Sequence, residues 1–153
     1  VNFQLSSALL AGQVDAVIGG YRNIEALELE LQGKKLTVFN VEDHGTPAYD
    51  ERIIVANRDD VAAPKIKKFL AALKRGGEYL QAHPDETWQK FAASHSELNT
   101  ELNRLAWKKS LPLFAADPAH LDTARYQAYE QFMFDNKLIK KITPVEQYAV
   151  EIK

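Results

Sequence analysis

The sequence predicts an incomplete α/β fold, with a thin, mostly parallel sheet at its front and a helical C-terminal half. In the first third of the chain, short apolar runs of strand type alternate with amphipathic segments of helical periodicity. From Asp59 onward the apolar residues recur at helical spacing only. The 153 residues are enough for one domain with a hydrophobic core.

The chain opens with a predicted helix over residues 2–12, whose sequence is NFQLSSALLAG. Asn2 is a residue type that caps helix N-termini, and Gly12 stands where the end of a helix favours a left-handed residue. The run VDAVI (14–18) then has the length and apolar character of a buried strand.

A second helix is expected between Asn23, as its N-cap, and Gly33. Two further strands are predicted, KLTVFNV (35–41) and RIIVAN (52–57). Because a strand, a helix and a strand with short connections pair in parallel, a right-handed crossover is expected. Mostly apolar strands need cover on both faces, so the predicted sheet lacks part of its cover.

The rest of the chain is predicted to be helical. Residues 59–83 form a long amphipathic pattern that ends at His83-Pro84. Gly76 and Gly77 are expected to weaken or bend this helix, because each glycine costs about 1 kcal/mol relative to alanine inside a helix. Shorter helices follow, and the segment LDTARYQAYEQFMFDN (121–136) repeats apolar residues along one face.

Composition excludes several classes of function. Lys and Arg number 19 and Asp and Glu 21, and this net charge of −2 gives no electrostatic reason to expect a nucleic-acid partner. No apolar run approaches the roughly 20 residues that span a bilayer. The chain has no cysteine, and its four histidines lack metal-ligand spacing, so neither a thiol nucleophile nor a metal site is expected.

The start of the chain is unusual, because it opens at Val1 without a signal-peptide pattern and enters a predicted helix within two residues. Together with the missing cover of the sheet, this start leads us to expect that residues before Val1 belong to the fold.

The stretch VDAVIGGYRNIEALELE (14–30) carries the strongest candidate binding site. In open α/β sheets, ligands bind where the carboxyl end of a strand meets the next helix. Gly19 and Gly20 lie at such an end and would let a ligand approach the backbone. Tyr21 offers a ring face and a hydroxyl group, and Glu25 offers a carboxylate that accepts hydrogen bonds from an amino group.

The alternative interpretation of this stretch is structural. Two glycines make a tight turn, Tyr21 packs, and Asn23 with Glu25 stabilises the start of a helix. Phosphate binding is disfavoured, because GGYRNIE matches neither G-x-x-x-x-G-K-[ST] nor G-x-G-x-x-G.

The polar loop EDHGTPAYDE (42–51) is the second candidate. Tyr49 is as consistent with lining a pocket as with half-buried packing, whereas His44 is expected in an ordinary surface turn. The large aromatic residues of the C-terminal half are interpreted as packing residues: Trp88, Trp107, Tyr126, Tyr129, Phe132 and Phe134.

Three runs resemble a known family. ALLAGQVDAVIGGYRNIEALELELQGKKL (8–36) and HGTPAYDERIIVANRD (44–59) are similar to the NMT1/THI5-like family, and RYQAYEQFMFDNKLI (125–139) resembles its C-terminal helix. Members of that family include solute-binding proteins of ABC importers for thiamine pyrimidine precursors. The similarity covers essentially the whole chain and matches the second half of a family member.

The resemblance implies a type II periplasmic-binding-protein-like fold, in which two α/β lobes close on a ligand. Residues 1–43 would complete the second lobe as a βαβ unit, residues 44–50 would cross between the lobes, and residues 51–153 would form part of the first lobe. Half of a two-lobed protein would expose apolar faces, which predicts self-association of this chain.

The resemblance also implies a ligand and partners. The strand-end motif of binding members supplies an aromatic residue and a glutamate to an aminopyrimidine, and these fall on Tyr21 and Glu25. The implied role is delivery of a thiamine-related pyrimidine to ABC permease subunits. The implied location is the periplasm or another extracytoplasmic compartment, and a lipid anchor is compatible with this location. No cofactor is expected, and the expected ligand-binding set is Gly19, Gly20, Tyr21, Asn23, Glu25 and Tyr49.

The alternative function is an enzyme of pyrimidine biosynthesis from the same superfamily. That synthase branch carries a cysteine cluster where this chain has Gly45, Thr46, Pro47, Ala48 and Tyr49, without a thiol. We therefore expect binding without catalysis.

Overall fold

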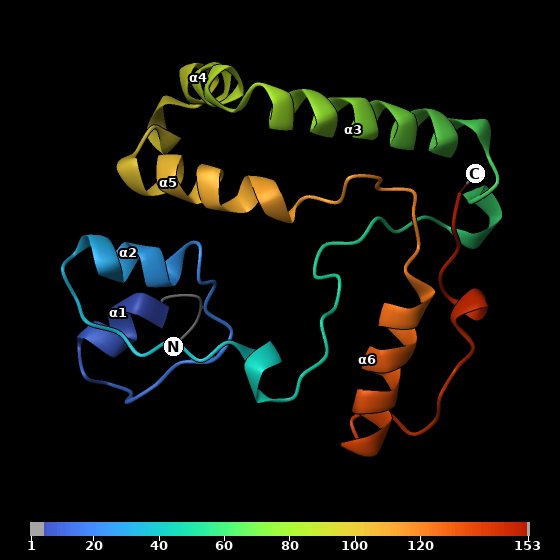
Figure 1. The fold of residues 1–153 in the computed structure, drawn as a ribbon, viewed down its shortest axis with the longest axis horizontal. Coiled ribbons are helices and arrows are strands. Elements are labelled where there is room, and N and C mark those ends of the chain that lie inside the picture. The colour runs from blue at the N-terminus through green and yellow to red at the C-terminus, as the bar shows by residue number, and fades with distance from the viewer. Residues whose placement is uncertain (1–4, 153) are drawn as a thin grey trace. The chain divides into compact units, whose positions relative to one another are not determined.

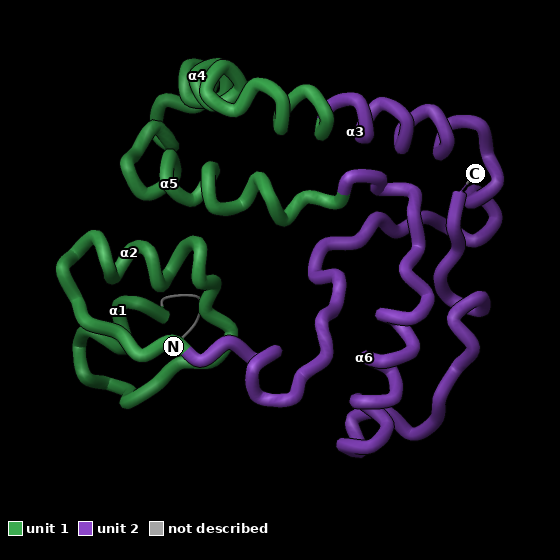
Figure 2. Tube along the Cα trace, in the orientation of Figure 1, with its two compact units in different colours: residues 1–38, 77–115 green, residues 39–76, 116–153 purple. Residues whose placement is uncertain are grey.

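The computed structural model describes residues 5–152 of the chain, which divides into two compact units (Figure 2). The first unit comprises residues 1–38 and 77–115, and the second comprises residues 39–76 and 116–153. These boundaries differ from the lobe boundaries expected from the sequence, since residues 77–115 group with the N-terminal segment. The assignment of residues 1–43 and 51–153 to two lobes stays a prediction.

Helices build the first unit (Figure 1). The helix α2 packs against α1 and α5, and α5 also packs against α4. The buried apolar residues are small or aliphatic: Ala8, Leu27, Leu29, Ala92 and Ala106. The elements of this unit are α1 (Leu5–Leu10), α2 (Glu25–Leu31), α4 (Pro84–Ser94), η3 (Ser96–Leu98), α5 (Glu101–Ser110) and η4 (Leu111–Leu113), where η denotes a 3₁₀ helix.

An aromatic cluster joins α4 to α5 within the first unit. The ring of Trp107 lies 5.8 Å from that of Trp88 and is stacked 5.6 Å from that of Phe91, measured between centroids. The indole N–H of Trp107 donates to the backbone carbonyl of Pro84 at 3.2 Å, so its polar atom is satisfied. The prediction that Trp88 and Trp107 are packing residues is confirmed.

The second unit combines short 3₁₀ turns with α6 (Thr123–Asp135), which packs against η5 (Val145–Gln147). Asp122 caps α6, because its carboxylate accepts the backbone N–H of Arg125 at 3.1 Å. The buried residues of α6 and η5 are Glu130 and Val145. The remaining 3₁₀ turns of this unit are η1 (Val41–His44) and η2 (Arg58–Asp60).

The longest helix, α3 (Pro64–Ala82), runs without interruption through Gly76 and Gly77 (Figure 1). The chain passes from the second unit to the first at this pair of glycines. The predicted boundary at His83-Pro84 is confirmed, because α3 ends at Ala82 and α4 begins at Pro84. A proline fits the first turn of a helix, where its missing N–H costs nothing.

The three predicted strands are not observed in residues 5–152, where the structure forms no strand. Residues 14–18, 35–40 and 52–57 form irregular chain, and most of their apolar residues are exposed: Ile18 is 89% exposed and Val55 is 81% exposed. A strand needs a neighbouring strand for its backbone hydrogen bonds and cover for its side chains. The described residues supply neither, whereas the predicted helical half is confirmed.

The predicted helix caps have mixed outcomes. Gly12 and Gly33 adopt positive φ angles of 63° and 72° after α1 and α2, as predicted. Asn23 is not the N-cap of α2, because Ile24 takes that position and no side chain caps the helix. Asn2 lies outside the described residues.

Candidate functional site

The predicted strand-end motif forms a tight turn that leads into α2. The backbone N–H of Tyr21 donates to the Oε2 atom of Glu25 at 2.8 Å. The carbonyl oxygen of Tyr21 accepts the backbone N–H groups of Ile24 at 3.1 Å and Ala26 at 3.3 Å. Both backbone groups of Tyr21 are therefore tied to the first turn of α2, and the Glu25 carboxylate lies beside the Tyr21 backbone.

The two glycines of the turn have different requirements. Gly19 has a φ angle of +86°, a conformation that residues with a Cβ atom rarely adopt. Gly20 has no such angle, and a Cβ atom built on it would lie 3.8 Å from the Cβ atom of Glu25, an ordinary contact. The backbone therefore requires glycine at position 19 only.

Asn23 anchors this turn instead of capping α2. Its Nδ2 atom donates to the Oγ atom of Ser110, the last residue of α5, at 2.7 Å. The side chain is half-buried, and its amide nitrogen is engaged by this bond within the first unit. Asn23 thus positions the turn, and its direct contact with a ligand stays a prediction.

The side chains of the turn remain accessible. Tyr21 is 39% exposed, and Glu25 is half-buried. A carboxylate offers about four acceptor positions, so the bond to the Tyr21 N–H leaves Glu25 able to accept further donors. The turn therefore offers an aromatic ring and an acceptor within a few residues, which suits a flat ligand that carries N–H groups.

Tyr49 lies in the second unit, where it lines a cavity of about 470 Å³. Its ring is 4.8 Å from the ring of Tyr129, measured between centroids. This placement fits both interpretations of Tyr49, packing and pocket lining, and its contact with a ligand stays a prediction. Because Tyr21 and Glu25 belong to the first unit, a binding site shared by all three residues stays a prediction.

Most residues that line this cavity were not predicted from the sequence. Tyr126 and Tyr129 were interpreted as packing residues, and neither Glu130 nor Tyr148 was singled out. The available signal was the mixture of phenol groups with a glutamate on one helix face, which is unusual for a purely apolar core. Lining the cavity are Tyr49, Asp50, Arg125, Tyr126, Tyr129, Glu130, Met133, Ile139, Lys141, Thr143 and Tyr148.

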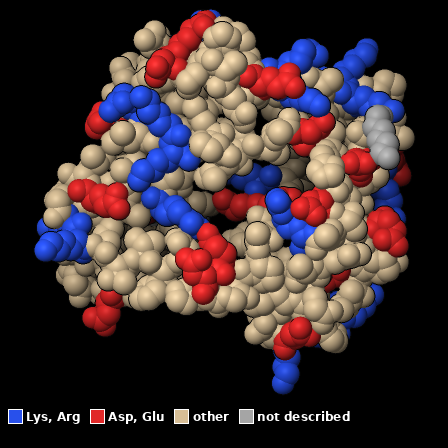
Figure 3. Space-filling view, in the orientation of Figure 1, with Lys and Arg blue, Asp and Glu red and all other residues tan. Residues whose placement is uncertain are grey.

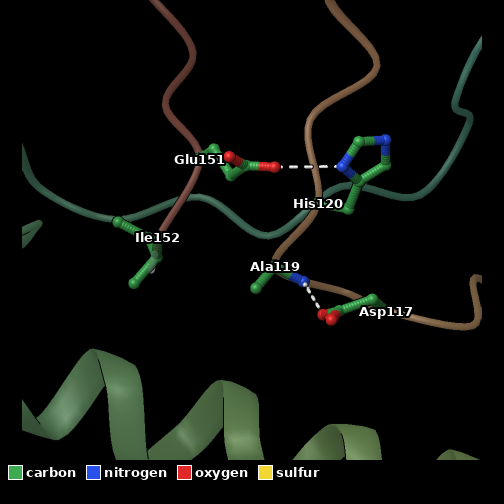
Figure 4. A pocket seen from close by; sticks show the side chains of 5 residues that line it. All are labelled: Asp117, Ala119, His120, Glu151 and Ile152. Carbon is green, nitrogen blue, oxygen red and sulfur yellow. Dashed lines mark hydrogen bonds and ion pairs between the residues drawn. The ribbon is translucent and has the colours of Figure 1, made fainter.

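A second hollow in this unit is lined by Asp117, Ala119, His120, Glu151 and Ile152 (Figure 4). The Nδ1 atom of His120 lies 3.0 Å from Oε1 of Glu151, and the backbone N–H of Ala119 donates to Asp117 at 3.0 Å. Lys74 also donates to Asp117, at 2.6 Å, and holds the pKa of that carboxyl below its usual value. The polar groups here bind one another, so we assign no ligand.

The described residues 5–152 contain no group of three His, Asp or Glu side chains placed to hold a metal ion. Within the same part of the chain, no helix is long and apolar enough to cross a membrane.

Basic and acidic side chains are interspersed over the visible face (Figure 3). His44 lies in η1, with its ring 5.5 Å from that of Phe39.

Comparison with known proteins identifies relatives of the chain. The family model described as NMT1/THI5 like matches residues 1–87. A "Putative thiamine biosynthesis protein" of Haemophilus influenzae is 49% identical over 154 residues, an alignment that covers 100% of this chain and 49% of the relative. These matches confirm the resemblance predicted from residues 8–36 and 44–59.

More distant relatives have names of two kinds. A "Formylaminopyrimidine-binding protein" of Halalkalibacterium halodurans is 30% identical over 74% of this chain and 35% of its own length. A "4-amino-5-hydroxymethyl-2-methylpyrimidine phosphate synthase" of Candida albicans is 29% identical over 70% of this chain and 35% of its own length. The chain thus spans about half or less of these relatives. No solved structure matches it.

Proposed function

Because the chain belongs to the NMT1/THI5-like family, we propose that it is part of a solute-binding protein for a thiamine-related aminopyrimidine. The family implies a periplasmic-binding-like α/β fold. In the proposed role, the protein acts outside the cytoplasm and hands the pyrimidine to the permease subunits of an ABC importer. It binds its ligand without changing it.

One structural observation carries the proposal. The turn before α2 keeps the accessible Tyr21 and the carboxylate of Glu25 within one hydrogen-bonded motif, with 2.8 Å between the Tyr21 nitrogen and Glu25 Oε2. An aminopyrimidine is a flat ring with an exocyclic amino group. A tyrosine ring offers it a stacking surface, and a carboxylate accepts its N–H donors. The name of the formylaminopyrimidine-binding relative supports the same ligand class.

The test is a calorimetric titration of the protein with 4-amino-5-hydroxymethyl-2-methylpyrimidine. Glu25→Gln is expected to weaken binding roughly tenfold to a hundredfold, because a hydrogen bond to a charged group contributes about 1.5–3 kcal/mol. The amide oxygen of glutamine still accepts the Tyr21 N–H, which preserves the turn. Tyr21→Ala is expected to weaken binding about tenfold through the lost stacking.

Glu28→Gln is the matched control, because it removes the same charge one turn further along α2. Its affinity is expected to stay within twofold of the unchanged protein. Equal affinities of the Glu25→Gln, Tyr21→Ala and Glu28→Gln proteins would refute the assigned site.

The synthase function is a second candidate, favoured by the 29% identity to the Candida albicans enzyme. Prolonged incubation followed by chromatography separates the two functions. A solute-binding protein returns the pyrimidine unchanged and in equal amount. Formation of a new pyrimidine from a supplied precursor would instead establish an enzyme.

A further inference from the structure

The cavity of about 470 Å³ in the second unit has the size and lining of a small-molecule site. Its walls come from the segment around Tyr49, from α6, and from the chain between Ile139 and Tyr148. Four of the six tyrosines of the chain line it: Tyr49, Tyr126, Tyr129 and Tyr148. All residues that line this cavity belong to the second unit, whereas the Tyr21–Glu25 turn belongs to the first.

The tyrosine rings form a stacking surface. The ring centroids of Tyr49 and Tyr129 lie 4.8 Å apart with 32° between the planes, and those of Tyr126 and Tyr148 lie 6.3 Å apart with 35° between the planes. Met133 adds a polarisable thioether to the lining. Flat aromatic molecules pack well against such a wall, because tilted and offset ring pairs are favourable at these distances.

Glu130 is the one buried charged residue among those that line the cavity. Glu130 is only 6% exposed. Its Oε1 atom accepts the backbone N–H of Thr143, and its Oε2 atom accepts the Tyr148 hydroxyl at 3.4 Å. These two donors hold the carboxylate in place. About four acceptor positions are available on a carboxylate, so Glu130 can accept further N–H donors from a molecule inside the cavity.

The charges that line the cavity cancel. Asp50 and Glu130 are formally negative, whereas Arg125 and Lys141 are formally positive. Arg125 also forms an ion pair with Asp50, which neutralises both groups. A lining with balanced charge favours a neutral occupant over an ion, because neither sign of charge is attracted on balance.

We propose that this tyrosine cavity binds a neutral, flat heteroaromatic ring that carries an amino group, with Glu130 accepting its N–H donors. The inference rests on the proposed function for the ligand class, an aminopyrimidine, but it concerns a separate set of residues. The ring lies against the tyrosine wall, and the amino group points to Glu130.

The test is an NMR titration of the protein, with ¹³C-labelled tyrosine rings, using 4-amino-5-hydroxymethyl-2-methylpyrimidine as the probe. Saturable shifts are expected for the cavity tyrosines, and Tyr79 in the first unit is expected not to shift. Shifts of Tyr21 report on the proposed function independently. If Tyr21 shifts and the cavity tyrosines do not, the inference is wrong and the proposed function stands. If none of these signals shifts, both are wrong.

Variants then test the two roles within the cavity. Tyr129→Leu is expected to lower the apparent affinity for the probe at least fivefold, as measured from the shifts of the other cavity tyrosines. Phe134→Leu, on the same helix but outside the cavity lining, is the matched control. Equal affinities of these two variants would overturn the stacking role.

Glu130→Gln keeps an oxygen to accept the Thr143 N–H and is expected to weaken binding about tenfold. Glu146→Gln in η5 is its control, and circular dichroism checks that both variants fold. A probe with hydrogen in place of the amino group is expected to bind the unchanged protein about tenfold more weakly than the amino probe does. Equal binding of the two probes would overturn the role of Glu130, even if the Glu130→Gln protein does not fold.

Discussion

Asp117, in the second unit, is an ionisable residue whose carboxylate is held by two hydrogen bonds. Its carboxylate accepts a hydrogen bond from Lys74 at 2.6 Å and another from the Ala119 backbone N–H at 3.0 Å. The hydrogen bond from Lys74, and then that from Ala119, lowers the pKa of Asp117 in the folded state. The unfolded chain therefore takes up a proton at a higher pH than the folded chain does.

The expected consequence is a loss of stability in acid. The contribution of Asp117 is fully present above its unfolded pKa of about 3.9 and is lost as the pH falls through the lower folded value. Asp117→Asn should lower the melting temperature at pH 6, and the difference from the unchanged protein should shrink toward pH 3. Thermal melts measured by circular dichroism across this range provide the check. Asp59→Asn is the control, and an equal pH profile for the two variants would contradict the prediction.

Contacts between single residues were predictable where the two residues are close in the sequence. Tyr21 and Glu25 are four positions apart, and the structure brings the backbone of one to the carboxylate of the other. The N-cap role of Asn23 was wrong, because its side chain binds Ser110, 87 residues away in sequence. No local pattern encodes a partner at that separation.

At the scale of elements, helix boundaries were predictable and strands were not. Proline restricts the residue before it and lacks an N–H, so His83-Pro84 separates two helices through local sterics alone. A strand instead depends on a partner that is distant in sequence. The segment RIIVAN has the composition of a strand but finds no such partner in residues 5–152.

Gly76 and Gly77 lead to a prediction about α3. Both lie inside the helix, and a Cβ atom added to either would meet no heavy atom within 4 Å. Glycine in a helix costs roughly 0.5–1 kcal/mol relative to alanine, because the unfolded chain loses more freedom. The double variant Gly76→Ala/Gly77→Ala should therefore raise the free energy of unfolding by about 1–2 kcal/mol in urea titrations.

Gly12→Ala is a control that is expected to change the free energy of unfolding in the opposite direction to the double variant in α3. Space is also open around Gly12, but its φ angle of +63° disfavours a residue with a Cβ atom. This variant should lower the free energy of unfolding by about 1 kcal/mol. A stabilising Gly12→Ala, or a destabilising double variant in α3, would show that open space and φ do not decide these positions.

At the scale of the whole molecule, apolar exposure is the feature that most affects behaviour in solution. Within RIIVAN, Ile53 is 58% exposed and Val55 is 81% exposed. Short apolar segments of strand type with unpaired backbone groups pair readily with other chains. The net charge of −2 provides little repulsion between copies.

We therefore expect the chain to self-associate through residues 53–55, giving a mass above 17.3 kDa in size-exclusion chromatography with light scattering. Val55→Lys should shift the population toward the monomer, because a lysine charge opposes pairing along the segment. Leu138→Lys is the matched control, since Leu138 is 67% exposed and the substitution changes the net charge equally, from −2 to −1. If association persists in Val55→Lys as in Leu138→Lys, contacts outside residues 53–55 hold the copies together. A monomer at millimolar concentration would show that the predicted self-association is wrong.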